Sequence, residues 1–102
     1  MAYWSVIGTG IGDVEGKRFG VTLDTAAGTW TATGPSVSAF FATISGAFKV
    51  VGIPENGTQL VSPAGKEVAF FTALNASSAV GDAGKGRASE RGVTFGWKLD
   101  SK

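Results

Sequence analysis

The residue types that most often carry catalysis are missing from this sequence. It has no histidine and no cysteine, which removes the usual general base near neutral pH, the commonest metal ligand and all thiol chemistry. Serine and threonine are plentiful, but no histidine is present to activate them and no Ser-x-x-Lys spacing occurs. The sequence therefore predicts no catalytic residues, no metal site and no cofactor, and we expect a protein that is not an enzyme.

Two glycine-rich segments have part of the composition of nucleotide-binding loops but not their spacing. Residues 8–12 read Gly-Thr-Gly-Ile-Gly, whereas the dinucleotide fingerprint places its third glycine three residues after the second. Gly81 and Gly86 have the spacing of a phosphate-binding loop, but Arg87 and Ala88 stand where that loop has Lys and Ser or Thr. We therefore interpret 8–12 as an ordinary loop and 81–92, which is poor in apolar residues, as a Gly-rich flexible loop or arm.

The basic residues of this arm are candidates for contact with an anion or a partner protein: Lys85, Arg87 and Arg91. Asp82 and Glu90 lie in the same segment, so three cations and two carboxylates leave a net charge of +1. Nucleic-acid-binding proteins usually carry a denser basic stripe. We therefore keep a nucleic-acid-associated protein as an alternative function and do not expect nucleic acid to be the main partner.

Aromatic side chains supply the second group of candidates. Trp97 shares a strand face with apolar residues and is expected in the core. Trp30 is flanked by threonines, and Trp4 lies beside Tyr3 near the start of the chain. Exposed tryptophans form stacking platforms for sugars, and aromatic residues are enriched in protein interfaces. Trp4, Trp30 and Tyr3 are therefore the ligand or interface candidates, and a small carbohydrate- or ligand-binding β module is a further alternative.

The elements that must position these residues show mainly the two-residue period of β-strands. Apolar and polar residues alternate in Arg18–Asp24 and in 93–99. Strands with one solvent-exposed face each indicate an antiparallel sheet. Weaker strand signals lie at 3–9, Thr29–Thr33, 47–53 and 58–62, with a hairpin expected from 18–23 to Thr29–Thr33 and another across the turn residues Pro54 to Gly57. The predicted fold is mainly β, a small antiparallel barrel or sandwich.

Two segments favour short helices instead, at about 36–45 and 67–75. Apolar residues of the first segment fall three, four and seven residues apart, and Pro35 and Gly46 are placed to begin and end a helix. Phe70, Phe71 and Leu74 cluster similarly in the second segment. We expect one or two short helices that cover an end of the sheet. A chain of 102 residues then forms one domain, 1–102.

The sparse charge of the chain indicates a protein that packs against other proteins. Charged residues make up 17% of the sequence and the formal net charge is +1, so electrostatic repulsion between copies is weak. We expect a soluble structural or assembly protein that packs against copies of itself or a larger lattice, such as a phage capsid, tail or decoration protein in a virion.

The sequence has neither the pattern of a signal peptide nor a run of the ~20 apolar residues that span a membrane. We therefore expect synthesis in the cytoplasm and incorporation into a particle.

Overall fold

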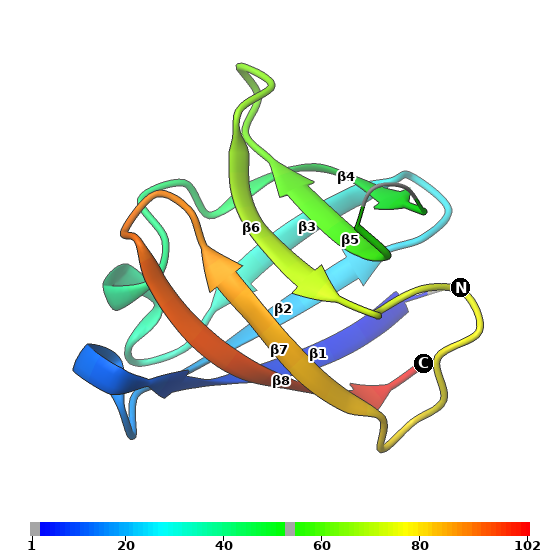
Figure 1. Cartoon of the computed structure of the whole chain (residues 1–102). Helices are drawn as coiled ribbons and strands as arrows, with labels where there is room; N and C mark the ends of the chain where they lie inside the picture. The colour runs from blue at the N-terminus through cyan, green and yellow to red at the C-terminus, as the bar shows by residue number, and fades with distance from the viewer. Residues whose placement is uncertain (1–2, 53–54) are drawn as a thin grey trace.

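Antiparallel strands that follow one another along the chain close into a barrel (Figure 1). The computed structural model describes residues 3–52 and 55–102, and within these residues β8 closes the sheet by pairing with β1. The prediction of a mainly β antiparallel fold is confirmed, and the sheet is a barrel rather than a sandwich. The elements are β1 (Tyr3–Ile11), η1 (Gly12–Val14), β2 (Arg18–Asp24), β3 (Thr29–Thr33), η2 (Val37–Ala39), β4 (Ser45–Val51), β5 (Gly57–Val61), β6 (Glu67–Thr72), β7 (Ala83–Ala88) and β8 (Val93–Ser101), where η denotes a 3-10 turn.

The inward faces of β2 and β8 carry the apolar residues that the alternating pattern predicts. The residues between them are partly or fully exposed. The alternation therefore gives the orientation of both strands correctly. The inward side chains are at most 2% exposed: Phe19, Val21, Leu23, Phe95, Trp97 and Leu99.

Both predicted hairpins form. β2 pairs with β3, and Oδ1 of Asp24 accepts hydrogen bonds from the amides of Ala26 at 3.1 Å and Ala27 at 3.0 Å, which stabilises the turn. Gly28 ends this turn with a φ of +72°, a conformation that favours glycine. β4 pairs with β5, while Pro54 of the predicted turn lies outside the described residues.

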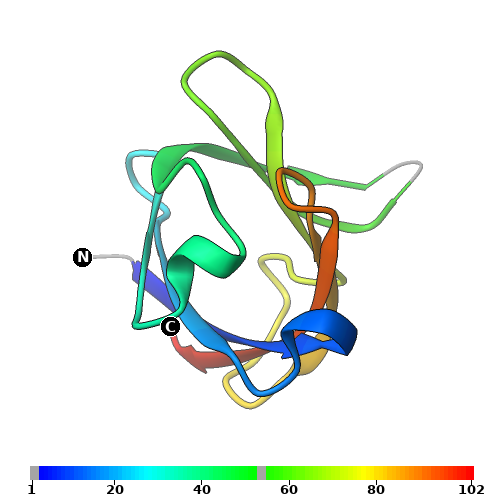
Figure 2. The ribbon, with the colours of Figure 1, turned by 90° about the vertical axis from the view of Figure 1, so that its left-hand side faces the viewer.

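The chain covers both ends of its own barrel. The start of β1 and the end of β8 lie at one end, the termini end, together with the β2–β3 turn and the 73–82 loop (Figure 1). Leu74 of that loop is fully buried. At the opposite end, the plug end, the segment 34–44 crosses the barrel opening (Figure 2) and buries the rings of Phe40 and Phe41.

Aromatic rings fill the space between the two ends. The ring centroid of Phe19 lies 4.6 Å from that of Phe40, 4.8 Å from Phe41 and 5.0 Å from Phe95. Phe71 extends this cluster, with its centroid 5.1 Å from that of Phe95. Tilted and edge-on contacts at these distances are the favoured geometry for aromatic pairs. The lumen is therefore a packed core rather than a cup for a ligand.

Trp30 enters the core across a glycine. It pairs with Gly46 of β4, and its indole Nε1 donates a hydrogen bond past that glycine to the carbonyl oxygen of Val61 on β5, at 2.9 Å. A Cβ atom on Gly46 would lie 2.9 Å from Nε1 and 2.0 Å from the Val61 oxygen. Only glycine at position 46 leaves room for this bond.

The same arrangement recurs on the other side of the barrel. Trp97 pairs with Gly84 of β7, and its Nε1 donates to the carbonyl oxygen of Thr72 on β6 at 3.0 Å. A Cβ on Gly84 would lie 2.8 Å from that Nε1. Two phenylalanines also lie over glycines of a neighbouring strand, because a Cβ would approach the ring of Phe19 to 2.2 Å at Gly8 and the ring of Phe95 to 2.5 Å at Gly86.

The helix predicted at 36–45 is wrong. Only Val37–Ala39 forms a 3-10 turn, and β4 begins at Ser45. Phe40 and Phe41 are both buried because the segment plugs the barrel, and Ile44 of the predicted apolar stripe is 52% exposed. The spacing of apolar residues therefore reflects two adjacent contacts with the lumen and not a helical face.

The helix predicted at 67–75 is also wrong, because the segment begins with β6. Successive side chains of a strand point to opposite faces. Phe71 packs in the lumen, whereas Phe70 lies on the outer wall beneath the guanidinium group of Arg87. Both rings are at most 3% exposed, so both faces of β6 carry large apolar residues and the alternation is lost.

The segment 81–92, predicted as a flexible Gly-rich loop or arm, contains strand β7 instead. Gly84 and Gly86 face inward opposite Trp97 and Phe95, and the charged Lys85 and Arg87 face outward. The strand has no large apolar side chain because its partner strands supply the rings that fill the lumen. Its low hydropathy is therefore compatible with a central place in the barrel.

We expect Gly46→Ala to lower the free energy of unfolding by about 2 kcal/mol or more, because the new Cβ collides with a backbone oxygen in a packed wall. Gly20→Ala on β2 is the matched control, because its Cβ would meet no atom closer than 3.7 Å. Replacing a strand glycine at an unhindered position is expected to be neutral or to stabilise by about 0.5 kcal/mol. Urea denaturation measures both effects, and equal unfolding midpoints for the two variants would contradict this packing of Trp30 against Gly46.

Candidate functional site

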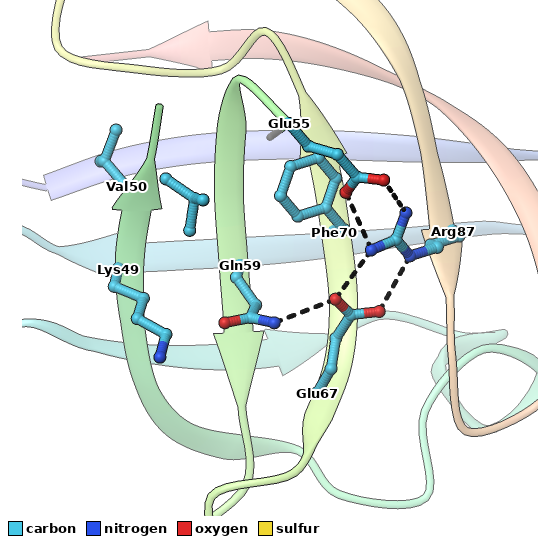
Figure 3. A pocket seen from close by; sticks show the side chains of 8 residues that line it. Lys49, Val50, Glu55, Gln59, Glu67, Phe70 and Arg87 are labelled. Atoms are coloured by element: carbon cyan, nitrogen blue, oxygen red, sulfur yellow. Dashed lines mark hydrogen bonds and ion pairs between the residues drawn. The ribbon is translucent and has the colours of Figure 1, made fainter. Parts of the chain in front are cut away.

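Arg87 lies at the centre of a polar cluster on the outer wall (Figure 3). It pairs with Phe70 across β6 and β7, and its guanidinium carbon lies 4.8 Å from the centre of that ring. The hollow above the cluster has a volume of about 370 Å³. Its lining residues come from four strands and a turn: Lys49, Val50, Val51, Glu55, Gln59, Glu67, Phe70 and Arg87.

Two carboxylates share the donors of the Arg87 guanidinium group. Nε and Nη2 donate to the two oxygens of Glu67, each at 2.9 Å. Nη1 donates to Oε1 of Glu55 at 3.0 Å, and Nη2 lies 3.0 Å from the other Glu55 oxygen. Glu67 also accepts hydrogen bonds from Nε2 of Gln59, at 3.0 Å, and from Oγ of Ser89. We call these five residues the Arg87 clamp.

The clamp stabilises the charged forms of its members. Hydrogen bonds from Arg87, assisted by those from Ser89 and Gln59, lower the pKa of Glu67 to about 2. The hydrogen bonds to Glu67 and Glu55 raise the pKa of Arg87 above its usual value. Glu67 therefore remains ionised in the folded protein well below the pH at which a free carboxyl group is protonated.

The geometry of the clamp makes it a structural tie between strands. Its side chains connect β5, β6 and β7 at a place where β6 and β7 share three residue pairs. The guanidinium group is already matched by two carboxylates, so an external phosphate would have to displace one of them. Arg87, expected as an anion or partner contact, is thus occupied within its own chain.

Sequence reasoning identifies Arg87 but misses its partners Glu55, Glu67 and Gln59. No local pattern connects these residues, because they meet through the register of β5, β6 and β7. Because the sequence pattern predicts a helix at 67–75, it also gives no indication that Glu67 lies on the outer face of a strand.

The other two basic candidates lie apart from the clamp. Nε of Arg91 donates to the backbone oxygen of Ser38 at 3.2 Å, which ties the β7–β8 turn to the plug. Lys85 is exposed and makes no hydrogen bond or ion pair with any residue in 3–52 or 55–102. All three basic candidates are exposed, and their contact with an anion or partner stays a prediction.

A second tie joins the β7–β8 turn to the plug. Glu90 accepts hydrogen bonds from the amides of Ala42 at 2.9 Å and Thr43 at 3.0 Å, and from Oγ1 of Thr43 at 2.8 Å. Partial burial raises the pKa of Glu90, but these hydrogen bonds outweigh it and hold the pKa below its usual value. The ionised carboxylate therefore helps to keep the plug seated.

The aromatic candidates do not form a stacking platform. Trp30 is 1% exposed and lies in the core. Trp4 is half-buried, with Nζ of Lys102 5.4 Å from its ring centre, and that ammonium group also donates to the carbonyl oxygens of Ala76 and Ser78. Tyr3 is 42% exposed on the opposite face of β1 from Trp4. The structure thus separates the three residues from one another.

No protein-family model matches the chain, and no curated protein or solved structure shows significant similarity to it. In the part of the chain that the structure describes, no group of three or more acidic side chains is positioned to hold a metal ion. Helices long and apolar enough to cross a membrane are likewise absent from the described residues.

The clamp predicts a specific loss of stability in acid. The pKa of Glu67 is about 2 in the folded protein and 4.5 in an unperturbed chain, so between these pH values the unfolded state binds more protons. The contribution of Glu67 is present in full above the unfolded pKa and is lost as the pH falls toward the folded one. We expect Glu67→Gln to lower stability at pH 7 by about 1 kcal/mol and to flatten the fall in stability between these limits.

Urea denaturation across that pH range measures this effect. Glu15→Gln, which removes an exposed carboxylate from the β1–β2 turn, is the control and should keep the wild-type slope. The assignment fails if Glu67→Gln and wild type lose stability in parallel.

Proposed function

We propose that this domain is a non-enzymatic structural or assembly protein that packs against copies of itself. The filled lumen supports this proposal because it removes the interior as a place for a small ligand. Among the described residues no buried side-chain nitrogen or oxygen lacks a hydrogen-bond partner. An active site usually holds some polar groups in reserve for its substrate, so fully paired polar groups favour a structural role.

The observation that carries the proposal is an open strand edge at the termini end. β3 pairs with β4 through Ser45, Gly46 and Ala47, and the amide of Phe48 then donates to the carbonyl oxygen of Gly28 at 3.0 Å. Beyond this point, within the residues that the structure describes, β4 pairs with β5 and with no second strand. Figure 2 shows the β4–β5 hairpin projecting from the barrel wall.

Val50 lies on that open edge. Every second residue of an antiparallel ladder directs both backbone groups to the same side. Phe48 directs its amide toward β3. Val50, two residues further along β4, directs its amide and carbonyl groups to the same side, but it lies beyond the residues that pair with β3. Unpaired edges of this kind accept a strand from another molecule. The edge therefore suits pairing with the same edge of a second copy.

Exposed apolar side chains lie at the same end of the barrel. Tyr3, Val50 and Val80 are 42%, 50% and 60% exposed, and their elements lie at the termini end in Figure 1. Burial of such side chains would add to the backbone hydrogen bonds of a paired edge. A net charge of +1 leaves little repulsion between copies. A virion capsid, tail or decoration protein is the specific form of assembly that we propose.

We expect the purified protein to associate at micromolar concentrations, with a mass above 10.4 kDa in sedimentation equilibrium. The double variant Val50→Lys/Val80→Lys should shift this equilibrium to the monomer, because it places charge in the proposed interface. Ile11→Lys/Ile44→Lys is the matched control, because these residues are 43% and 52% exposed at the plug end. A wild-type protein that remains monomeric, or equal effects of the two double variants, would contradict the proposal.

A further inference from the structure

A second hollow lies on the outer wall over β7, β8, β1 and β2, and it shares no lining residue with the hollow above the Arg87 clamp. Its volume is about 490 Å³, and Ile7, Thr9, Arg18, Gly96, Lys98 and Asp100 are among its lining residues. A shallower hollow beside Gly20 adjoins it, since Ile7 and Arg18 line both. The two form one depression across the strands.

The floor of the depression includes two outward-facing glycines, Gly20 and Gly96, that the packing of the barrel does not require. On the inner face, a Cβ on Gly8, Gly84 or Gly86 would come within 3.0 Å of an aromatic ring. On the outer face, a Cβ on Gly20 or Gly96 would meet no atom closer than 3.7 Å. A strand glycine weakens the strand, and glycines in strands often mark a bulge, a tight bend of a barrel, or a site where another backbone or a ligand approaches closely.

Cations flank this floor: Arg18 and Lys98 line the larger hollow, and Lys85 pairs with Gly96 across β7 and β8. The register places Lys85, Gly96, Thr9 and Arg18 in one row across the four strands, and Lys98 lies one row further along β8. Arg18, Lys85 and Lys98 are exposed, and none forms an ion pair with the described carboxylates. Asp100 is the one carboxylate among the lining residues of the larger hollow, so cations outnumber anions there.

We propose that this depression binds an extended acidic peptide segment of a partner protein. The glycine floor lets a main chain lie close to the wall, the three cations pair with its carboxylates, and Ile7 offers an apolar contact between them. A single-stranded nucleic acid fits less well, because it relies on exposed aromatic rings for base stacking and the depression has none: Trp97 in its wall is 2% exposed. An assembly protein would hold a second component at this site, apart from its contact with its own copies.

The probe is a fluorescein-labelled peptide of alternating glutamate and glycine, titrated with the protein at low salt and followed by fluorescence anisotropy. We expect saturable binding that weakens as NaCl is added, because exposed ion pairs are screened by salt. A peptide with glutamine in place of glutamate and an oligonucleotide of equal charge should bind more weakly. Absence of binding, equal binding of the glutamine peptide, or tighter binding of the oligonucleotide overturns the proposal.

Variants locate the binding on the wall. Arg18→Ala/Lys98→Ala should weaken binding of the glutamate peptide about tenfold, since it removes two charge-assisted contacts. Lys49→Ala/Lys66→Ala removes the same charge from exposed positions elsewhere and should leave the affinity within about twofold of wild type, as expected for distant screened charges. Equal losses in the two variants would show a net-charge effect and overturn the site. Because all four side chains are exposed, both variants are expected to fold, which circular dichroism checks.

Discussion

A large aromatic ring opposite a strand glycine is the contact on which the rest of this structure depends. The contact is most extensive for Trp30 over Gly46 and for Trp97 over Gly84, because each indole also donates a hydrogen bond to the strand beyond the glycine. Each ring thereby connects three consecutive strands and adds bulk to the lumen. A chain of 102 residues can then close the eight strands that the structure describes around a solid core without a disulfide.

Polar ties complete the barrel where strand pairing is short. The Arg87 clamp lies outside the three-pair contact of β6 and β7, and Glu90 fixes the plug from the β7–β8 turn. These contacts pair Arg87, Glu55, Glu67 and Glu90 with groups of their own chain. What remains for other molecules is the exterior: the open edge of β4 and the glycine-floored wall over β7, β8, β1 and β2. The proposals of self-packing and of an acidic partner both rest on these two exposed surfaces.

Sequence reasoning succeeds where a strand has one apolar face and one solvent-exposed polar face, and it fails where either face is missing. Arg18–Asp24 alternates clearly, and the pattern predicts both its orientation and its hairpin. In β6 the ring of Phe70 is covered on the outer wall by Arg87, so the segment resembles a helix. β7 has the opposite problem, since its inward residues are glycines and its apolar partners lie on β8. Burial of Trp30 depends on Gly46, 16 positions away, and only the strand register reveals that pairing. The clamp likewise joins residues that no local spacing relates.

Hydrogen exchange of the three indole N–H groups, followed by NMR, tests the central claim of a filled, indole-bonded lumen most directly. Trp30 and Trp97 are hydrogen-bonded in the core, so their indole protons should exchange only through global unfolding, with protection equal to the full free energy of unfolding. The half-buried Trp4 should exchange much faster. Rapid exchange of Trp30 or Trp97 under native conditions would mean that the lumen is open to water, which would contradict a core closed by indole–glycine contacts.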